Sequence, residues 1–411
     1  MLLSLERRLM RDTRLRDQYT AFMADYLSLG HMAAVPDAEI DRPEAHYLPH
    51  HAVFKGSNLG DKIRVVFNAS FSTATGFLND LLLPGSKLQS DLWLILSRWR
   101  FFKFVFTCDI IKMFRQIRVL SEDTHLQRIL WRPDPAAEVQ DFYLLTVVYG
   151  TALAPYFALR VLIQLADDEG MAYPLGAKAI KQNSYMDDFY GGEHTLEEAL
   201  ETLRQLVAIL RAGGFELSKW AANTPELCPD EESTAKLLHD REGVSTLGVL
   251  WSPADDRFAL RVAPSTRVSG STKRSVLSDV ARFFDPLGWA VGYEVDGTVE
   301  LHGFSDAFSR GYAAAVYLRC TDASGEVSVH LVVAKTKVAP VRPVTIPQLE
   351  LQGALLLAEL LDATGRGLDL SGAQKFAWID AAVVLAWIRS HPSRWKHFVA
   401  NRVAKIPSQY P

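Results

Sequence analysis

Two adjacent aspartates in an apolar stretch constrain this chain more than any other feature. Residues 185–188 are Tyr-Met-Asp-Asp, and two glycines follow at positions 191 and 192. Side-by-side carboxylates repel one another, and each loses hydration if it is even partly buried. A divalent cation removes both penalties, because Mg²⁺ prefers hard carboxylate oxygens. The pair therefore predicts either a strand–turn–strand that holds a metal at its tip or a surface hairpin with solvated carboxylates, and these four residues do not decide between them.

The length and composition of the chain predict a globular protein of about two to three domains. It has 411 residues, of which 48% are apolar and 22% charged, so it can bury large cores. The net charge is −4, so a nucleic-acid partner would meet local basic patches or metal ions rather than an overall positive charge. Three widely spaced cysteines favour a reducing compartment and argue against a disulfide framework or a zinc site.

We expect no membrane association. Charged residues come too early in the N-terminal sequence for a signal peptide. Residues 143–166 are apolar enough to suggest a membrane span, but Gly150, Pro155 and Arg160 interrupt them. A strand, a turn and a buried helix is the better interpretation of this stretch.

Hydrophobic patterns predict both helices and strands along the chain. Residues 1–35 favour helix, residues 50–67 favour a hairpin with basic residues near its turn, and residues 196–213 favour an amphipathic helix that ends at two glycines. Proline and glycine cluster in residues 253–297, where we place a domain boundary. The pattern of residues 299–411 predicts the order strand, strand, strand, helix, strand, helix. Further expected elements are a helix at 88–99 and strands at 101–108 and 246–251.

A third carboxylate, Asp109, follows a short apolar segment well before the Asp-Asp pair. If that segment is a strand beside the 185–188 hairpin, Asp109 converges with Asp187 and Asp188. Three carboxylates can hold two metal ions about 4 Å apart, which stabilise the attacking and leaving oxygens of an in-line displacement. The competing interpretation makes Asp109 the N-cap of a following helix, and the two interpretations are compatible.

Seven segments occur in an order that resembles a reverse transcriptase, and more narrowly the Pao/BEL type of long-terminal-repeat retrotransposon. They are His-Ala-Val-Phe-Lys (51–55), Lys-Ile-Arg-Val-Val-Phe-Asn-Ala-Ser (62–70), Phe-Thr-Cys-Asp-Ile-Ile-Lys-Met-Phe-Arg-Gln-Ile (106–117), Val-Tyr-Gly-Thr-Ala-Leu-Ala-Pro (148–155), Tyr-Met-Asp-Asp (185–188), Gly-Phe-Glu-Leu-Ser-Lys-Trp (214–220) and Leu-Gly-Val-Leu-Trp (247–251). The resemblance covers roughly residues 15 to 290. It implies an α+β fold with a polymerase palm-and-fingers domain.

The resemblance also implies roles for the acidic and basic residues of these segments. Asp109 and Asp187 would bind the metals, with Asp188 adjacent. Lys55 and Arg64 would meet the incoming triphosphate, because lysine and arginine form charge-assisted contacts with phosphate. For each of these two residues the competing interpretation is an ordinary solvated surface charge.

Four further residues and one segment gain roles from the same resemblance. Phe114 matches an aromatic gate that would exclude a 2′-hydroxyl, and a core phenylalanine is the alternative. Gly150 would let the backbone approach nucleotide and template closely, with Tyr149 beside it. Lys219 matches a lysine that would act as a general acid toward pyrophosphate, and a surface hairpin lysine is the alternative. Residues 247–251 match a loop that grips the primer strand.

A second acidic set follows in the last part of the chain. Asp306 and Asp380 each come near the end of a predicted strand, and Glu350 comes near the start of a predicted helix. This order resembles ribonuclease H, an α/β domain with a mixed sheet, which would hold two Mg²⁺ ions on these three carboxylates and cleave RNA in an RNA–DNA hybrid. The competing interpretation is that the aspartates cap helices and that Glu350 favours a helix dipole.

The combined prediction is an RNA-directed DNA polymerase, a nucleotidyltransferase, with an attached RNase H-like domain from a retrotransposon polyprotein that serves DNA transposition. We expect Mg²⁺ as cofactor, with Mn²⁺ as a substitute. The expected partners are an RNA template, a DNA primer, an RNA–DNA hybrid and deoxynucleoside triphosphates. The sequence does not define an oligomeric state. The expected location is intracellular, in a cytoplasmic virus-like particle or in the nucleus.

The expected domains carry two departures from the resembled families, a short connector and a short last domain. They are an N-terminal helical lead-in (1–50), reverse transcriptase fingers and palm (51–252), a shortened thumb or connector (253–298) and an RNase H-like domain that stops before a fourth acidic ligand (299–411). The short connector favours an alternative, a degenerate or domesticated protein that binds nucleic acid without catalysis. The intact carboxylates favour the enzyme. A third hypothesis, an unrelated metal hydrolase, would require the order of the seven segments to be coincidence.

Overall fold

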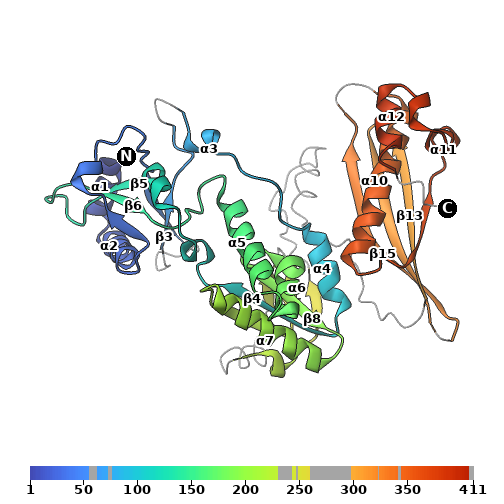
Figure 1. Cartoon of the computed structure of the whole chain (residues 1–411), viewed down its shortest axis with the longest axis horizontal. Coiled ribbons are helices and arrows are strands. Elements are labelled where there is room, and N and C mark those ends of the chain that lie inside the picture. Colours follow the sequence, from blue (N-terminus) through green and yellow to red (C-terminus); the bar gives the residue numbers. More distant parts are fainter. Residues whose placement is uncertain are drawn as a thin grey trace, which may run out of the picture.

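The computed structural model describes residues 1–54, 63–72, 76–229, 243–246, 249–259, 298–322, 324–340 and 344–406. Its elements form three units (Figure 1), and the first is built from two stretches of the chain, because the strands at 128–131 and 140–144 form one sheet with the N-terminal strand at 32–34. We call them the N-terminal, central and C-terminal units. Lys55, the pair at 247–248 and residues 260–297, which make up most of the expected connector, lie outside the described residues.

The N-terminal unit packs two helices against two small sheets. Its elements are α1 (Leu2–Arg11), α2 (Thr13–Ser28), β1 (Met32–Ala34), β2 (His50–Phe54), β3 (Ile63–Phe67), β5 (Arg128–Trp131) and β6 (Gln140–Leu144). The sheet orders are β1-β6-β5 and β2-β3. The predicted N-terminal helix and the predicted hairpin are confirmed. One hydrophobic core joins the helices to the hairpin, with Tyr19, Tyr26 and Phe67 at its centre, so residues 1–50 share their core with the strands that follow.

The central unit is an antiparallel sheet with three helices on one face and one helix, α4 (Leu92–Phe101), on the other. The strand order is β7-β8-β4-β9. Its other elements are β4 (Phe104–Ile110), α5 (Ala154–Asp168), α6 (Pro174–Asn183), β7 (Ser184–Tyr185), β8 (Asp188–Glu193), α7 (Leu196–Ala212) and β9 (Leu217–Ala222). The predicted helix at 88–99, the strand at 101–108, the strand–turn–helix at 143–166 and the helix at 196–213 are confirmed, with boundaries moved by a few residues.

Alternation along the central strands divides the core into two layers. Phe106 and Phe189 point into the core formed with α5, α6 and α7. Their neighbours Val105 and Tyr190 join the opposite core, formed with α4 and Trp251. Because successive side chains of a strand point to opposite faces, a sheet with apolar residues at both positions is covered on both sides.

A small meander covers the second face together with α4. Its strands are β10 (Val244–Thr246), β11 (Val249–Ser252) and β12 (Arg257–Ala259), in that order. The single strand expected at 246–251 is therefore two strands. Short helical segments complete the first two units: η1 (Asp37–Glu39), α3 (Leu78–Leu81), η2 (Met113–Gln116), η3 (Ser121–Gln127) and η4 (Pro225–Leu227).

The C-terminal unit is a mixed sheet with the order β15-β14-β13-β16. Its elements are β13 (Thr298–Phe308), β14 (Gly311–Thr321), β15 (Val327–Val338), α10 (Ile346–Gly367), β16 (Gln374–Trp378), α11 (Ala382–Ile388), η5 (Pro392–Arg394) and α12 (His397–Val403). The first three strands are antiparallel, whereas β16 runs parallel to β13. The predicted element order and the mixed sheet are confirmed, with η5 and α12 as additions.

The helix α10 fills one face of this sheet and carries a second, smaller core on its other side. Leu351 and Ala354 of α10 pack with Val384 of α11 and Val403 of α12. Among the helices in the described part of the chain, none combines the length and the hydropathy that a membrane crossing requires.

The glycine pair behind the Asp-Asp turn makes a stability prediction. A Cβ added at Gly191 would lie 2.1 Å from Cζ of Phe106, and that ring is fully buried. We expect Gly191→Ala to lower the free energy of unfolding by about 1–3 kcal/mol through overpacking, measured by urea denaturation. Gly372→Ala is the matched control, because its Cβ would meet nothing within 4 Å. Equal stabilities of the two variants would contradict this packing.

Candidate active sites

The Asp-Asp pair lies on a tight turn between β7 and β8. Tyr185 pairs with Asp188 across the turn, and Met186 has a left-handed φ of 55°. A side chain in this region is uncommon and costs about 1 kcal/mol or more. The amide of Met186 donates a hydrogen bond to Oε1 of Gln89 at 2.9 Å. The carbonyl of Asp187 accepts from the amide of Ile110 at 2.8 Å, so the turn is fixed from two sides.

The structure places Asp109 directly opposite Asp188 on neighbouring antiparallel strands. The predicted contact between the apolar strand and the hairpin is confirmed. The competing N-cap interpretation is wrong, because β4 continues to Ile110 and Lys112 is the N-cap residue of the next helical segment. Residues directly opposite each other have Cβ atoms about 5 Å apart, so the three carboxylates share one end of the sheet.

Lys219 also reaches this site. A register shift between β4 and β9 follows Thr107, and Lys219 takes a left-handed φ of 54°. Its ammonium forms an ion pair with the carboxylate of Asp109. A hydrogen bond to Asp109 raises the pKa of Lys219, which keeps the lysine protonated. A cation of the protein thus neutralises the carboxylate that we expected to bind metal.

Lys219 does not balance the remaining negative charge. Burial, followed by the charges of Asp187 and Asp109, raises the pKa of Asp188 to about 6. Burial, followed by the charge of Asp109, also raises the pKa of Asp187. Both shifts show that the ionised forms are disfavoured in the free protein, which is the condition that a divalent cation relieves. The donor set of hard carboxylate oxygens fits Mg²⁺ or Mn²⁺.

The predicted nucleotide-binding residues come from the N-terminal unit and from its junction with the central unit. Arg64 is exposed on β3, and its charge is one of the influences that lower the pKa of Asp187 against the larger effect of burial. Phe114 is partly buried against the central core. This placement does not decide between a core phenylalanine and an aromatic gate that excludes a 2′-hydroxyl. Lys55 lies outside the described residues. The roles of these residues toward a nucleotide stay predictions.

Tyr149 and Gly150 pack closely against β3. The hydroxyl of Tyr149 donates a hydrogen bond to the carbonyl of Val65, and burial raises its pKa to about 12. A Cβ at Gly150 would lie 2.4 Å from the carbonyl oxygen of Phe67. The close backbone approach that requires glycine here is therefore an approach to β3, and a contact with nucleotide or template stays a prediction.

The second acidic set converges in the C-terminal unit. Asp306, Glu350 and Asp380 each offer an oxygen, and these oxygens lie within 4.8 Å of one another. Phe304 of β13 pairs with Trp378 of the parallel strand β16, so the two aspartates follow the same rung of the sheet. Within the described ranges, this is the one group of three acidic, histidine or cysteine side chains that meets so closely; Asp109, Asp187 and Asp188 are neighbours but do not gather to that extent.

The helix-capping alternatives for this set are wrong in detail. Asp306 lies inside β13, which runs to Phe308, and the N-cap residue of α11 is Ala381 rather than Asp380. Thr345 caps α10 in a capping box, and Glu350 is the fifth residue of that helix. The sequence predicts Glu350 near the helix start, and the structure places it at the beginning of the second turn.

The environment of Glu350 fits a bound cation. Its side chain is buried, and Oε2 has no hydrogen-bond partner among the described residues. Burial, followed by the charges of Asp380 and Asp306, raises the pKa of Glu350. One oxygen of Asp306 is held by the amide of Ala307 at 2.7 Å. An unpartnered buried carboxylate oxygen beside two further carboxylates is the donor set that a divalent metal satisfies.

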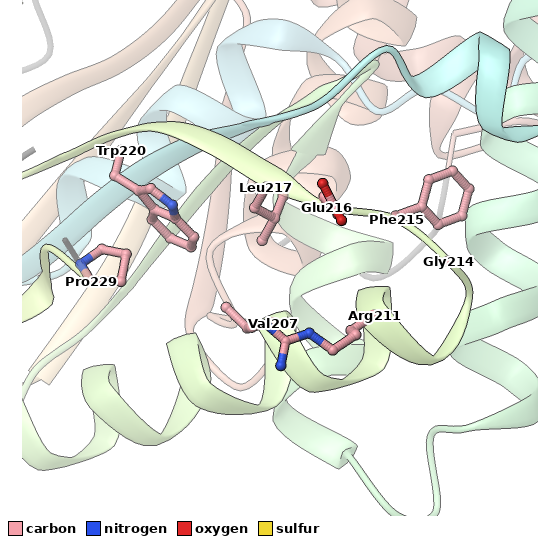
Figure 2. A pocket seen from close by; sticks show the side chains of 8 residues that line it. All are labelled: Val207, Arg211, Gly214, Phe215, Glu216, Leu217, Trp220 and Pro229. Carbon is pink, nitrogen blue, oxygen red and sulfur yellow. The ribbon is translucent and has the colours of Figure 1, made fainter. Parts of the chain in front are cut away.

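A separate cavity of about 510 Å³ lies between α7 and β9 (Figure 2). Val207 and Arg211 project from α7 toward the segment that carries Leu217 and Trp220. None of the predicted site residues lines this cavity.

Comparisons with known proteins agree with this architecture. Residues 290–381 match the family described as the Pao retrotransposon-like RNaseH-like domain, a range that includes Asp306, Glu350 and Asp380. A foamy viral protease-reverse transcriptase in complex with an RNA/DNA hybrid is similar in fold, with a TM-score of 0.56 and 13% identity over 97% of this chain and 53% of the viral chain. The chain has the fold of a reverse transcriptase joined to an RNase H-like domain.

A second foamy viral protease-reverse transcriptase structure, in complex with double-stranded DNA, has a TM-score of 0.50 and 15% identity over 93% of this chain and 66% of the viral chain. This reverse transcriptase-like chain thus spans about half to two thirds of the viral chains that it matches. No curated protein matches its sequence at a significant level. From here on the central unit is called the palm and the C-terminal unit the RNase H-like domain.

Two residues that contact the Asp-Asp turn and the helix end before it were not singled out from the sequence. Gln89 holds the palm turn through Met186, and Arg98 lies buried on α4 beside the residues that precede the turn. Both lie about 90 positions before the hairpin, and neither belongs to a motif. The sequence predicted only that this segment, residues 88–99, is helical.

The raised pKa of Asp188 makes a prediction about stability and pH. A carboxyl whose pKa is about 6 in the folded protein and 3.8 otherwise destabilises the fold above pH 6, and this effect disappears as the pH falls toward 4. We expect Asp188→Asn to raise the stability of the metal-free protein at pH 7 by about 1–2 kcal/mol, after allowance for partial solvent exposure. At pH 4 the two proteins should be equally stable. Urea midpoints at both pH values measure the effect, and a lower midpoint for the variant at pH 7 would contradict it.

Proposed function

We propose that this chain is an RNA-directed DNA polymerase with an attached RNase H-like nuclease. The observation that carries the proposal is the placement of Asp109 opposite Asp188, with Asp187 on the adjoining turn. Three carboxylates whose charge is incompletely neutralised lie at one end of a palm sheet. The second carboxylate set, in the RNase H-like domain, supports the paired activity.

In the polymerase reaction, the primer 3′-hydroxyl attacks the α-phosphate of a deoxynucleoside triphosphate, a new phosphodiester forms, and pyrophosphate leaves. Asp109, Asp187 and Asp188 would hold two Mg²⁺ ions. When bound, these ions supply stabilisation for the charge that develops on the attacking and leaving oxygens. Arg64 and Lys55 would orient the triphosphate through charge-assisted hydrogen bonds.

Lys219 is suited to donate a proton to the leaving pyrophosphate. Its raised pKa keeps the ammonium protonated, and its side chain is 70% exposed. A lysine that is charged and accessible can turn from Asp109 toward a phosphate, because its four-carbon stem is flexible. In the nuclease, Asp306, Glu350 and Asp380 would hold the ions at which a phosphodiester of RNA is hydrolysed.

The proposed partners are an RNA template, a DNA primer and deoxynucleoside triphosphates, with an RNA–DNA hybrid as the substrate of the nuclease. The foamy viral proteins of similar fold are bound to an RNA/DNA hybrid and to double-stranded DNA, which supports nucleic acid as the partner class here. We further propose that the protein acts inside the cell, in a cytoplasmic particle or in the nucleus.

Separation of the two activities tests the proposal. With Mg²⁺, a primed RNA template and deoxynucleotides, we expect Asp187→Ala to reduce primer extension by at least about 10³-fold and to leave hybrid cleavage unchanged. Glu350→Gln should abolish hybrid cleavage and leave primer extension unchanged. Both activities should require Mg²⁺ or Mn²⁺ and stop on chelation. Asp123→Ala, an exposed aspartate on η3, is the control and should retain both.

One observation favours the alternative of nucleic-acid binding without catalysis. The ion pair between Lys219 and Asp109 lets a protein cation neutralise one of the three metal-binding carboxylates. Under this alternative the wild-type chain binds hybrid but shows no extension that Asp187→Ala abolishes. The extension assay therefore decides between the two functions.

A further inference from the structure

The helix α4 contacts both the palm and the RNase H-like domain. Ile95, Leu96 and Trp99 belong to the palm core. Trp93 belongs to the core of the RNase H-like domain, with Leu94 packed against it. Six of the ten residues of α4 are buried, Ser97 and Arg98 among them, and Figure 1 shows α4 between the palm helices and α10. The two domains therefore meet along α4 within the described residues.

Arg98 links the ends of two helices across this interface. Its side chain is buried, and its Nε donates to the carbonyl of Gly367, the last residue of α10, at 2.6 Å. Its Nη1 donates to Oδ1 of Asn183 at 3.3 Å and to the carbonyl of Gln182. Residues 182 and 183 end α6 immediately before the strand that leads to the Asp-Asp turn. Cations are favoured at helix C-termini, and one guanidinium serves both ends.

The segment before α4 continues this link to the turn itself. Gln89 donates to the carbonyl of Ser184 at 3.0 Å and accepts from the amide of Met186 at 2.9 Å. Two residues later, Asp91 lies 3.5 Å from the ammonium of Lys335 in the RNase H-like domain. Nζ of Lys335 also lies 5.5 Å from the ring centroid of Trp93. Residues 89–98 thus contact the turn on one side and the nuclease domain on the other.

We propose that the RNase H-like domain, docked on α4, holds the palm turn at 185–188 in place, with Gln89 and Arg98 as positioning residues. Loss of the docking contact would loosen α4, and with it the two side chains that fix the turn and the strand before it. The domains are then coupled energetically as well as covalently. This coupling concerns the free protein and does not require that either site be catalytic.

Gly367 allows the docking to be tested from the nuclease side. A Cβ at Gly367 would lie 1.8 Å from Cδ1 of Leu94, so Gly367→Ala forces the two helices apart or displaces that side chain. Leu94→Ala removes the obstructing atoms. The double variant should therefore restore the contact that the single variant disrupts. Gly372→Ala is the matched control in the same domain, because its Cβ meets nothing within 4 Å.

The measurement is amide hydrogen exchange of the full chain, without metal or nucleic acid, in peptides that cover residues 184–190. We expect Gly367→Ala to raise the exchange rate there by about tenfold or more. The double variant with Leu94→Ala should return to within about threefold of wild type, and Gly372→Ala should not differ from wild type. Unchanged exchange at the turn in Gly367→Ala would overturn the proposal. The proposal would also be overturned if Leu94→Ala alone exchanged like wild type and the double variant still exchanged as fast as Gly367→Ala.

A second pair of variants tests Arg98 as the bridge. Arg98→Met should raise exchange both at residues 184–190 and at residues 364–370, where α10 ends, and Arg98→Lys should restore part of the protection at both. A response confined to the palm peptide would assign Arg98 to the palm alone and refute the bridge. Since no arm measures catalysis, these outcomes are independent of the extension assay.

Discussion

Strand pairing brings three carboxylates together at one end of the palm sheet, and the rest of this structure depends on holding them there. The register of β4 and β8 sets Asp109 against Asp188, and the turn adds Asp187 beside them. Repulsion and desolvation raise the pKa of two of these carboxyls. The sheet tolerates this only because buried packing on both of its faces fixes the strands. The fold thus stabilises an arrangement that its own electrostatics disfavour, which is how binding sites are built.

The two acidic sites resolve the same problem in different ways. In the palm, the ammonium of Lys219 pairs with Asp109, so part of the negative charge is balanced by the protein. In the RNase H-like domain, one buried oxygen of Glu350 has no partner in the described part of the chain. A buried unpaired acceptor costs more free energy than an exposed ion pair recovers. Both sites therefore leave negative charge that an external cation would stabilise, the palm on Asp187 and Asp188 and the RNase H-like domain on Glu350.

Local patterns predicted most elements and the Asp-Asp turn, because strand alternation, helix periodicity and the aspartate pair involve neighbouring residues. The distant acidic partners, Asp109 and the set Asp306, Glu350 and Asp380, were grouped by their expected positions at strand and helix ends and by the resemblance to known families. Contacts between distant segments were not predictable in this way. Nothing near Gln89 indicates that its amide meets Met186, and the bulge that turns Lys219 toward Asp109 has no distinctive residue type. Gly150 showed a close backbone approach, but its sequence did not reveal that the neighbour is β3.

The helix α4 shows the same limit at the level of domains. Its apolar residues occur on every side, so the sequence predicts burial but does not say against what. Trp99 packs in the core of the palm, and Trp93 packs in the core of the RNase H-like domain. Which core each side chain joins is decided by the tertiary fold and not by the sequence of the helix. A helix buried between two cores cannot be released from one without exposing apolar area to water, at about 25 cal/mol per Å². Any motion of the RNase H-like domain relative to the palm must therefore either break this contact or carry α4 and the residues that fix the turn along with it.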